Sequence, residues 1–513
     1  MDKRFFFCSP RTDFHTAFKE ILQLYFPEVE PTAIATADLQ YLHNQQDSSN
    51  VIIEAFTEGQ DEVRVCGVRL YGVLEVGCLE RKGEVTLLPW EKSSSGERRI
   101  LRLLLNQLLT HYLHISPSPW GVLRGIRPTK IVHRLLDRGL SACEIQGFLN
   151  RAYDVESTKA NLVTEIALSQ RDFLLSPDQA RKSVSIYIGI PFCPSRCLYC
   201  SFPSFPIGGA GQQVEQFLDT LRHEITAVHN FLTKRQIEVQ TIYVGGGTPT
   251  SLPNALFRQL LADIAQAFQG TAVQEYTIEA GRPDTITEDK LSTMREYGVS
   301  RISINPQSMR QKTLVAIGRS HRPEDVESVF WLARQFGFSS INMDIIAGLP
   351  GETPQDMSYT LERIAALMPD NLTVHTLAVK RGSVLKELSG FLRTETDIVR
   401  AMLGDCAQAA GEMGMIPYYL YRQKYMAGNM ENIGYALPDK SCLYNISIME
   451  ERQTILGLGA AAATKAVYPG SWRLESCHNP KDVSTYINDY KLYLERKLAL
   501  ADRVWRNEEE LTC

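Results

Sequence analysis

The sequence predicts an α/β protein whose central part is an incomplete six-stranded barrel. Two observations predict this fold: six short apolar runs alternate with five helical patterns between residues 184 and 377, and polar residues follow the ends of the runs. Strands that alternate with helices build βαβ units and a parallel sheet. Right-handed crossovers curl repeated units toward a barrel. A doubly wound open sheet is the structural alternative.

The expected strands and helices follow one another without repeats or low-complexity tracts. The expected strands cover 184–190, 239–244, 274–280, 299–305, 341–346 and 372–377. The expected helices cover 214–232, 256–268, 288–297, 323–336 and 353–368. Ligands sit at the carboxyl ends of the strands in either architecture, so residues after each strand are the candidates for a site.

Two further domains are expected around this central part, which covers 180–385. For residues 1–175 the sequence predicts an α+β domain of unknown role. Phe14, Phe18 and Ile21 lie at helical spacing, 51–56 and 63–68 are strand-like, and 99–113 is a leucine-rich helix. Residues 386–513 predict a mostly helical C-terminal domain.

Composition narrows the class of protein. The chain has 513 residues, 44% of them hydrophobic and 22% charged, which is ordinary for a globular protein. A net charge of −5 gives no basic excess that would favour nucleic acid as a partner. No apolar run is long enough to span a bilayer. The 11 cysteines are scattered apart from one group, which predicts a reducing, cytoplasmic location.

That group is Cys193, Cys197 and Cys200, with three residues in the first gap and two in the second. Thiolates suit soft metal centres and iron–sulfur clusters. Three of them can hold three irons of a cubane cluster and leave the fourth iron open for catalysis. A structural zinc site is an alternative, but it needs a fourth ligand, and the next twenty residues contain no further Cys or nearby His at ligand spacing. A disulfide is the other alternative.

The spacing of these cysteines, with Tyr199 before Cys200, resembles the signature of radical SAM (S-adenosylmethionine) enzymes. The preceding 187–192 segment is similar to that of the oxygen-independent coproporphyrinogen III oxidase family, which includes haem chaperones; later segments resemble its longer HemZ-type branch. The resemblance implies the radical SAM partial (β/α)6 barrel, a [4Fe–4S] cluster on the three cysteines, bound SAM, a low-potential electron donor and a tetrapyrrole substrate.

The resemblance also implies a set of SAM contacts, most of them at or after strand ends. They are Tyr187, Tyr199, Gly246, Gly247, Thr248, Glu279, Gln307, Arg319, Asp344 and Ala378. Each has a plain structural interpretation as well. A triple glycine is often only a turn, Tyr187 could be barrel core, and an Asp–Arg pair is commonly a salt bridge.

The implied reaction is the oxidative decarboxylation of coproporphyrinogen III to protoporphyrinogen IX through a 5′-deoxyadenosyl radical, without oxygen. A haem-binding chaperone that keeps the cluster but does not decarboxylate is the alternative. Gly189 and Ser201 depart from the family, which often has His and Cys there. No catalytic residue is singled out. Arg422 and Lys424, in a tyrosine-rich segment, are candidate partners for substrate propionates; an ordinary buried strand with exposed charges is the alternative for this segment.

Overall fold

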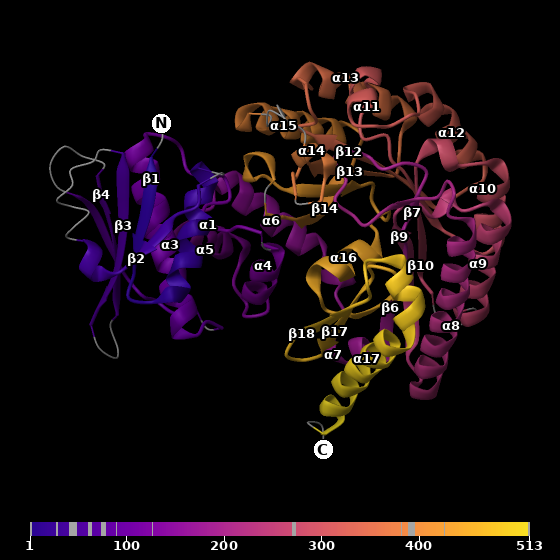
Figure 1. Ribbon diagram of the computed structural model, residues 1–513, viewed down its shortest axis with the longest axis horizontal. Coiled ribbons are helices and arrows are strands. Elements are labelled where there is room, and N and C mark those ends of the chain that lie inside the picture. Colours follow the sequence, from indigo (N-terminus) through magenta and orange to yellow (C-terminus); the bar gives the residue numbers. More distant parts are fainter. Residues whose placement is uncertain are drawn as a thin grey trace. The chain divides into compact units, whose positions relative to one another are not determined.

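The computed structural model describes residues 3–510 except 27–28, 40–48, 60–63, 73–77, 89, 126, 269–272, 381, 388–394 and 425. Residues 511–513, the end of the expected C-terminal domain, thus lie outside the described part. The chain forms two compact units, residues 1–165 and 166–513 (Figure 1). Each unit has its own sheet and is described by itself.

The first unit is an α+β domain, as the sequence predicts. Its sheet has the order β2-β1-β3-β4-β5. The strands are β1 (Arg4–Cys8), β2 (Thr32–Ile34), β3 (Asn50–Glu58), β4 (Val65–Tyr71) and β5 (Cys78–Glu84). The helices are α1 (Thr12–Tyr25), α3 (Ser93–Leu113), α4 (Thr129–Leu136), α5 (Ala142–Tyr153) and, running into the second unit, α6 (Ser157–Ser169). Phe14, Phe18 and Ile21 of α1 are fully buried, which confirms the amphipathic helix. Val63, at the start of the expected second strand, lies outside the described residues.

The second unit contains the six expected parallel strands. They are β6 (Ser183–Ile190), β9 (Glu238–Gly246), β10 (Glu275–Gly281), β11 (Arg301–Ile304), β12 (Ser340–Ala347) and β13 (Asn371–Thr376). They lie side by side in chain order and all neighbours are parallel. A doubly wound sheet would reverse its strand order part-way, so this order selects the singly wound, barrel-type alternative.

The crossover helices cover one side of these strands. They are α8 (Gly211–Arg235), α9 (Asn254–Phe268), α10 (Glu288–Glu296), α11 (Gln311–Ala316), α12 (Pro323–Gln335) and α13 (Pro354–Leu367). Figure 1 shows them following one another along the outside of the strands. Each helix buries an apolar stripe against the sheet; in α9 the stripe includes Phe257, Leu260, Leu261 and Ile264.

The C-terminal part is rich in helix but also extends the sheet, and the sequence indicated only one of its strands, in the tyrosine-rich segment. Its longer helices are α15 (Thr396–Glu412), α16 (Leu443–Glu450) and α17 (Val483–Glu510). Its strands are β14 (Ile416–Tyr421), β15 (Asn432–Ala436), β16 (Thr454–Gly459), β17 (Ala463–Tyr468) and β18 (Arg473–His478). β16 pairs with β6 in parallel, and β15 pairs with β13 antiparallel, so both ends of the barrel sheet are extended by this part. The expected boundary at residue 385 therefore lies inside one compact unit; a functional division there stays a prediction.

The barrel strands present a polar inner face. The side chains on this face include Ser185, Tyr187, Thr241, Tyr243, Thr277, Glu279, Arg301, Ser303, Asn342, Asp344, Thr373 and His375. They bond to one another across strands: Thr241 Oγ1 donates to Ser185 Oγ at 2.7 Å, and Arg301 Nη2 donates to Asn371 Oδ1 at 2.8 Å. The interior of an ordinary (β/α) barrel is instead filled with branched apolar side chains.

Among the described residues, every helix is too short or too polar to cross a membrane.

Candidate active site

The cysteine loop leaves β6 and is held against the end of β9 by backbone bonds. Gly247 N donates to Ile190 O at 2.7 Å, and Thr248 N donates to Phe192 O at 2.7 Å. A Cβ at Gly247 would lie 2.5 Å from Phe192 O and 3.1 Å from Cys193 Sγ, so only glycine allows this approach. The glycine segment therefore fastens the cysteine loop, besides any contact that it makes with a ligand.

The three cysteines lie close together: besides burial, Cys197 and Cys200 help to raise the pKa of Cys193, and Cys197 helps to raise the pKa of Cys200. Burial raises the pKa of the Cys193 thiol to about 11, and it also raises the pKa of Cys200. Two hydrogen-bond donors face the sulfurs: Thr248 Oγ1 lies 3.6 Å from Cys193 Sγ, and Arg282 Nη1 lies 3.6 Å from Cys197 Sγ. Donors of this kind stabilise the thiolate form that a metal requires.

This donor set fits a cluster. All ten cysteines in the described part of the chain are free, so the loop thiols are available as ligands. Among the described residues, no three His, Cys, Asp or Glu side chains lie close enough to hold a single metal ion. A cubane binds its thiolates on three different irons, so its ligand sulfurs stand further apart than those around one ion. Buried thiols that face fixed donors suit a cluster of this kind.

Glu279 lies at the end of β10 on the inner face, beside the glycine segment. Its Oε1 accepts from Tyr243 Oη at 2.6 Å, and its Oε2 accepts from Gly246 N at 3.2 Å. Burial, with a smaller contribution from Asp344, raises the pKa of Glu279 from 4.5 to about 7. The hydrogen bonds from Tyr243 and Gly246 oppose the rise. A carboxyl poised in this way gains charge readily when a cationic ligand group arrives.

Asp344, on β12, belongs to a second polar group of the inner face. Asn342 Nδ2 donates to Asp344 Oδ1 at 2.7 Å, and His375 Nε2 lies 3.7 Å from Asp344 Oδ2. His375 Nδ1 in turn lies 3.2 Å from Tyr421 Oη. Among the described residues, the other carboxylate oxygen of Asp344 has only a long contact to His375, which leaves it able to accept from a ligand hydroxyl.

Arg319, Tyr199 and Gln307 line the same rim. Arg319 Nη2 donates to Tyr199 Oη at 3.2 Å, its Nη1 donates to Asn305 O, and its buried Nε has no partner among the described residues. Gln307 has a φ of 67° and bonds on both sides to β12, through Asp344 O at 2.9 Å and Ile346 N at 3.0 Å. Its buried Oε1 has no partner in the described part either. Strained backbone and unpaired buried polar atoms concentrate at functional sites.

The remaining candidates complete the rim. The Tyr187 hydroxyl lies next to Gly246, since a Cβ placed there would be 3.3 Å from it. Ala378 follows β13 and forms a single antiparallel bridge with Met426. The ring of Tyr187 also stacks with that of Tyr444, with 6.2 Å between ring centroids. The side chain therefore packs in the barrel interior and also places its hydroxyl at the rim.

The sequence did not point to Arg282, Tyr243 or Tyr444. Tyr243 has the same inward register as Tyr187, and that alternation was the only signal available. Tyr444, on α16, stacks on Tyr243 at 4.3 Å and fills the interior below Glu279. Arg282 follows β10 directly and is 3% exposed, and nothing local marks it as a neighbour of Cys197.

The structure gives Arg422 another role than the one expected. Arg422 is 4% exposed, and its Nη2 donates to Asn429 O at 2.6 Å. Its Nε donates to Met430 O at 3.4 Å. The guanidinium therefore anchors the 427–430 turn, which makes it a poor partner for a propionate. Lys424 is exposed.

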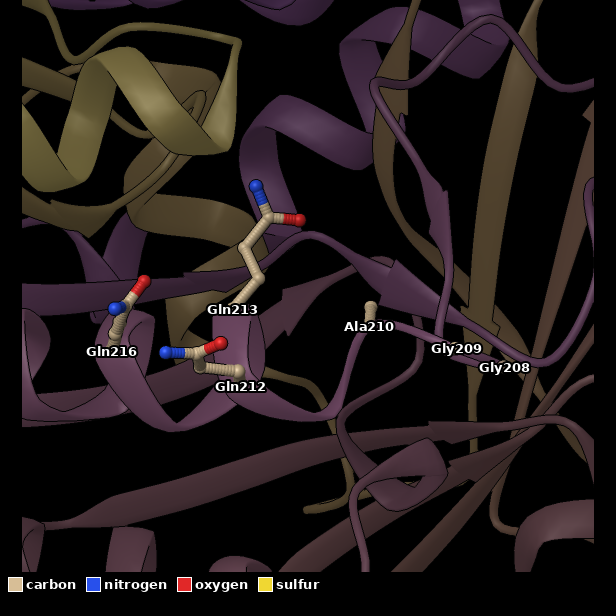
Figure 2. A pocket seen from close by; sticks show the side chains of 6 residues that line it. All are labelled: Gly208, Gly209, Ala210, Gln212, Gln213 and Gln216. Carbon is tan, nitrogen blue, oxygen red and sulfur yellow. The ribbon is translucent and has the colours of Figure 1, made fainter.

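A shallow cavity of about 550 Å³ lies elsewhere, at the start of α8 (Figure 2). It is lined by Gly208, Gly209, Ala210, Gln212, Gln213 and Gln216. Gln213 Nε2 donates to Ser484 Oγ at 3.0 Å. None of the candidate site residues lines it.

Comparison with known proteins agrees with this geometry. The family model described as the radical SAM superfamily matches residues 187–364. The oxygen-independent coproporphyrinogen-III oxidase-like protein HemZ of Bacillus subtilis is 41% identical over 496 residues, which is 96% of each chain. The chain is a radical SAM protein of the HemZ family. Radical SAM proteins of this family use a [4Fe–4S] cluster and S-adenosylmethionine, and the chain is a radical SAM enzyme in this broad sense.

Partial relatives fall into two groups. The heme chaperone HemW of Bacillus subtilis is 33% identical over 40% of this chain and 53% of its own. The oxygen-independent coproporphyrinogen III oxidase of Escherichia coli is 34% identical over 38% of this chain and 42% of its own. A crystal structure of coproporphyrinogen III oxidase (HemN) from Escherichia coli has a TM-score of 0.50 at 24% identity, covering 64% of this chain and 72% of that one. It supports the fold.

Proposed function

We propose that the protein decarboxylates coproporphyrinogen III oxidatively to protoporphyrinogen IX without oxygen. The observation that carries the proposal is the end-to-end likeness to a protein described as coproporphyrinogen-III oxidase-like. The polar inner face next to the cysteine loop agrees with it, because a polar tetrapyrrole needs a hydrogen-bonding interior rather than a packed apolar core.

In this proposal Cys193, Cys197 and Cys200 hold the cluster. When bound, the cluster and SAM together supply a 5′-deoxyadenosyl radical that removes a hydrogen atom from a substrate propionate. Loss of CO2 and of one electron then leaves a vinyl group, and the electron passes to a separate acceptor. The residues of the chain bind and orient the reactants and exclude water from them.

The SAM contacts are divided between two sides of the interior. Tyr187, Gly246, Gly247, Thr248 and Glu279 lie at the ends of β6, β9 and β10, beside the cysteines. Glu279 would hold the amino group of SAM, since its carboxyl already accepts from a backbone N–H. The other side is formed by Gln307, Asp344 and Ala378, at or after β11, β12 and β13, together with Arg319 and with Tyr199 of the cysteine loop itself. Here the Nε of Arg319, which has no partner among the described residues, suits a carboxylate, and the second carboxylate oxygen of Asp344 suits a ribose hydroxyl.

A low-potential electron donor and a tetrapyrrole substrate are the partners that this activity requires. A cytoplasmic location is part of the proposal, because ten free cysteines in the described residues agree with a reducing compartment.

Haem chaperone activity is the second candidate, and the likeness to HemW over 40% of the chain favours it. The decisive experiment gives anaerobically reconstituted protein coproporphyrinogen III, SAM and a one-electron reductant. We expect vinyl products detected by mass spectrometry and 5′-deoxyadenosine formed in step with CO2. SAM cleavage without vinyl products, together with stoichiometric haem binding, would replace the first proposal by the second.

A further inference from the structure

Arg282 is a buried cation at the edge of the cysteine loop. It is 3% exposed and lies between β10 and the short helix η3 (Pro283–Thr285). Its Nη1 contacts Cys197 Sγ at 3.6 Å and Ser195 Oγ at 3.3 Å. Both contacts are to the loop that carries the three cysteines.

The other edges of the guanidinium are clamped by the barrel. Nε donates to Asp284 Oδ1 at 3.0 Å and Nη2 donates to Asp284 Oδ2 at 3.1 Å, which is a bidentate pair. Nη2 also lies 3.3 Å from Ser320 Oγ. Because the fork is planar and held on two sides, its Nη1 edge is fixed in direction toward Cys197.

We infer that Arg282 is a positioning residue that raises the reduction potential of the cluster through its bond to Cys197. The inference rests on the proposed ligation of the cluster by the three cysteines. Reduction adds one electron from the donor, so the cluster and its thiolates become more negative by one charge. A fixed positive charge and an N–H bond to a ligand sulfur stabilise this reduced form more than the oxidised form.

Asp284 carries the opposite charge, so replacing it should shift the reduction potential in the opposite direction from replacing Arg282. Its carboxylate sits on the far side of the guanidinium and partly compensates it; the Arg282 hydrogen bonds help to lower the pKa of Asp284 below its ordinary value. Removal of the Arg282 charge should therefore lower the potential, whereas removal of the Asp284 charge should raise it. A residue that only props up the loop would not produce opposite shifts.

The test is a potentiometric titration of the reduced cluster, followed by electron paramagnetic resonance without SAM, in wild type, Arg282→Gln and Asp284→Asn. Arg322→Gln is the matched control, since that side chain is 70% exposed and screened by water. For Arg282→Gln we expect full iron content and an equilibrium constant for reduction about tenfold smaller, the loss typical of one charge-assisted bond. Tenfold is 59 mV for one electron.

The expected set of results is a lower potential for Arg282→Gln, a higher one for Asp284→Asn and no change for Arg322→Gln. An unchanged potential in Arg282→Gln with full iron would overturn the inference. If Arg282→Gln loses iron, the potential of Asp284→Asn is the deciding measurement. An unchanged or lower reduction potential in Asp284→Asn would then overturn the inference. Wild-type protein that binds no reducible cluster after reconstitution would instead overturn the proposed ligation, and the inference with it.

Discussion

Replacement of Glu279 by Gln tests the site through its electrostatics. The variant keeps the shape of the side chain and removes its charge. Raising the carboxyl pKa from 4.5 to about 7 corresponds to about 3 kcal/mol of extra free energy needed to ionise it in the fold. Tyr243 can still donate to the amide oxygen, but the bond from Gly246 N is lost because the amide NH2 group that replaces Oε2 cannot accept it, so 3 kcal/mol is an upper bound for the gain.

The sign of the stability effect follows from proton binding. Between pH 4.5 and about 7 the folded protein binds more protons at Glu279 than the unfolded chain does. Wild-type stability at this site is therefore fully present below pH 4.5 and is lost as the pH rises through 7. The Gln variant has no such loss. We expect the melting temperature of the variant, relative to that of wild type, to be a few degrees higher at pH 8 than at pH 5.

The effect on SAM affinity should be opposite to the effect on stability: as the pH rises, wild type should lose stability relative to the Gln variant but gain affinity for SAM. If Glu279 holds the cationic amino group, wild-type affinity relative to the Gln variant should rise about fivefold between pH 6 and pH 7, as a carboxyl with a pKa of about 7 ionises. Equilibrium dialysis of the cluster-loaded proteins under anaerobic conditions measures the ratio of wild-type to variant SAM affinity at each pH. Protonation of SAM itself affects both proteins equally and therefore does not change this ratio. A ratio that does not change with pH, or a Gln variant that melts far below wild type at pH 8, would refute the reasoning.

Two further substitutions test the cluster and the fold separately. Cys197→Ala should abolish the brown absorbance and SAM cleavage, whereas the control Cys477→Ala, on β18, should keep both; a Cys197 variant that holds four irons would contradict the assignment. Lys497→Met leaves the buried Glu224 carboxylate without its cation and should cost about 3–5 kcal/mol of stability in urea unfolding while iron content stays normal. Adding Glu224→Gln should recover part of the loss, and no recovery would show that packing rather than charge is at stake.

The barrel could be predicted because its signals are local. Each strand is a short apolar run, each crossover helix has a helical period, and the order along the chain is also the order across the sheet. The rule that sites lie at the carboxyl ends of strands then grouped the cysteine loop with Glu279, Gln307 and Asp344. The Glu279–Gly246 bond and the Gln307–Asp344 backbone bond confirm that these neighbours meet.

Apart from β14 in the tyrosine-rich segment, the strands of the C-terminal part could not be predicted because their stability is non-local. β16 is held by β6, which lies about 270 residues earlier, and β18 is polar and half exposed at the sheet edge. The expected role of Arg422 as a partner of a substrate propionate could not be judged from the sequence for a related reason. Composition shows that a cation is present, but only the fold shows that backbone carbonyls at Asn429 and Met430 already satisfy it.

The polar interior carries its own argument about ligand binding. Most inner-face groups satisfy one another, as Ser185 does with Thr241, and this offsets the cost of burying them. Among the described residues, four buried side-chain oxygens of this region lack a partner: Thr277 Oγ1, Ser303 Oγ, Asn305 Oδ1 and Gln307 Oε1. They belong to β10, β11 and the segment after β11, next to Glu279. An unpaired buried polar group costs about 1–3 kcal/mol, so four in one region are costly unless a polar ligand or ordered water pairs with them. The unpaired groups thus lie along the part of the rim that carries the SAM candidates Glu279 and Gln307.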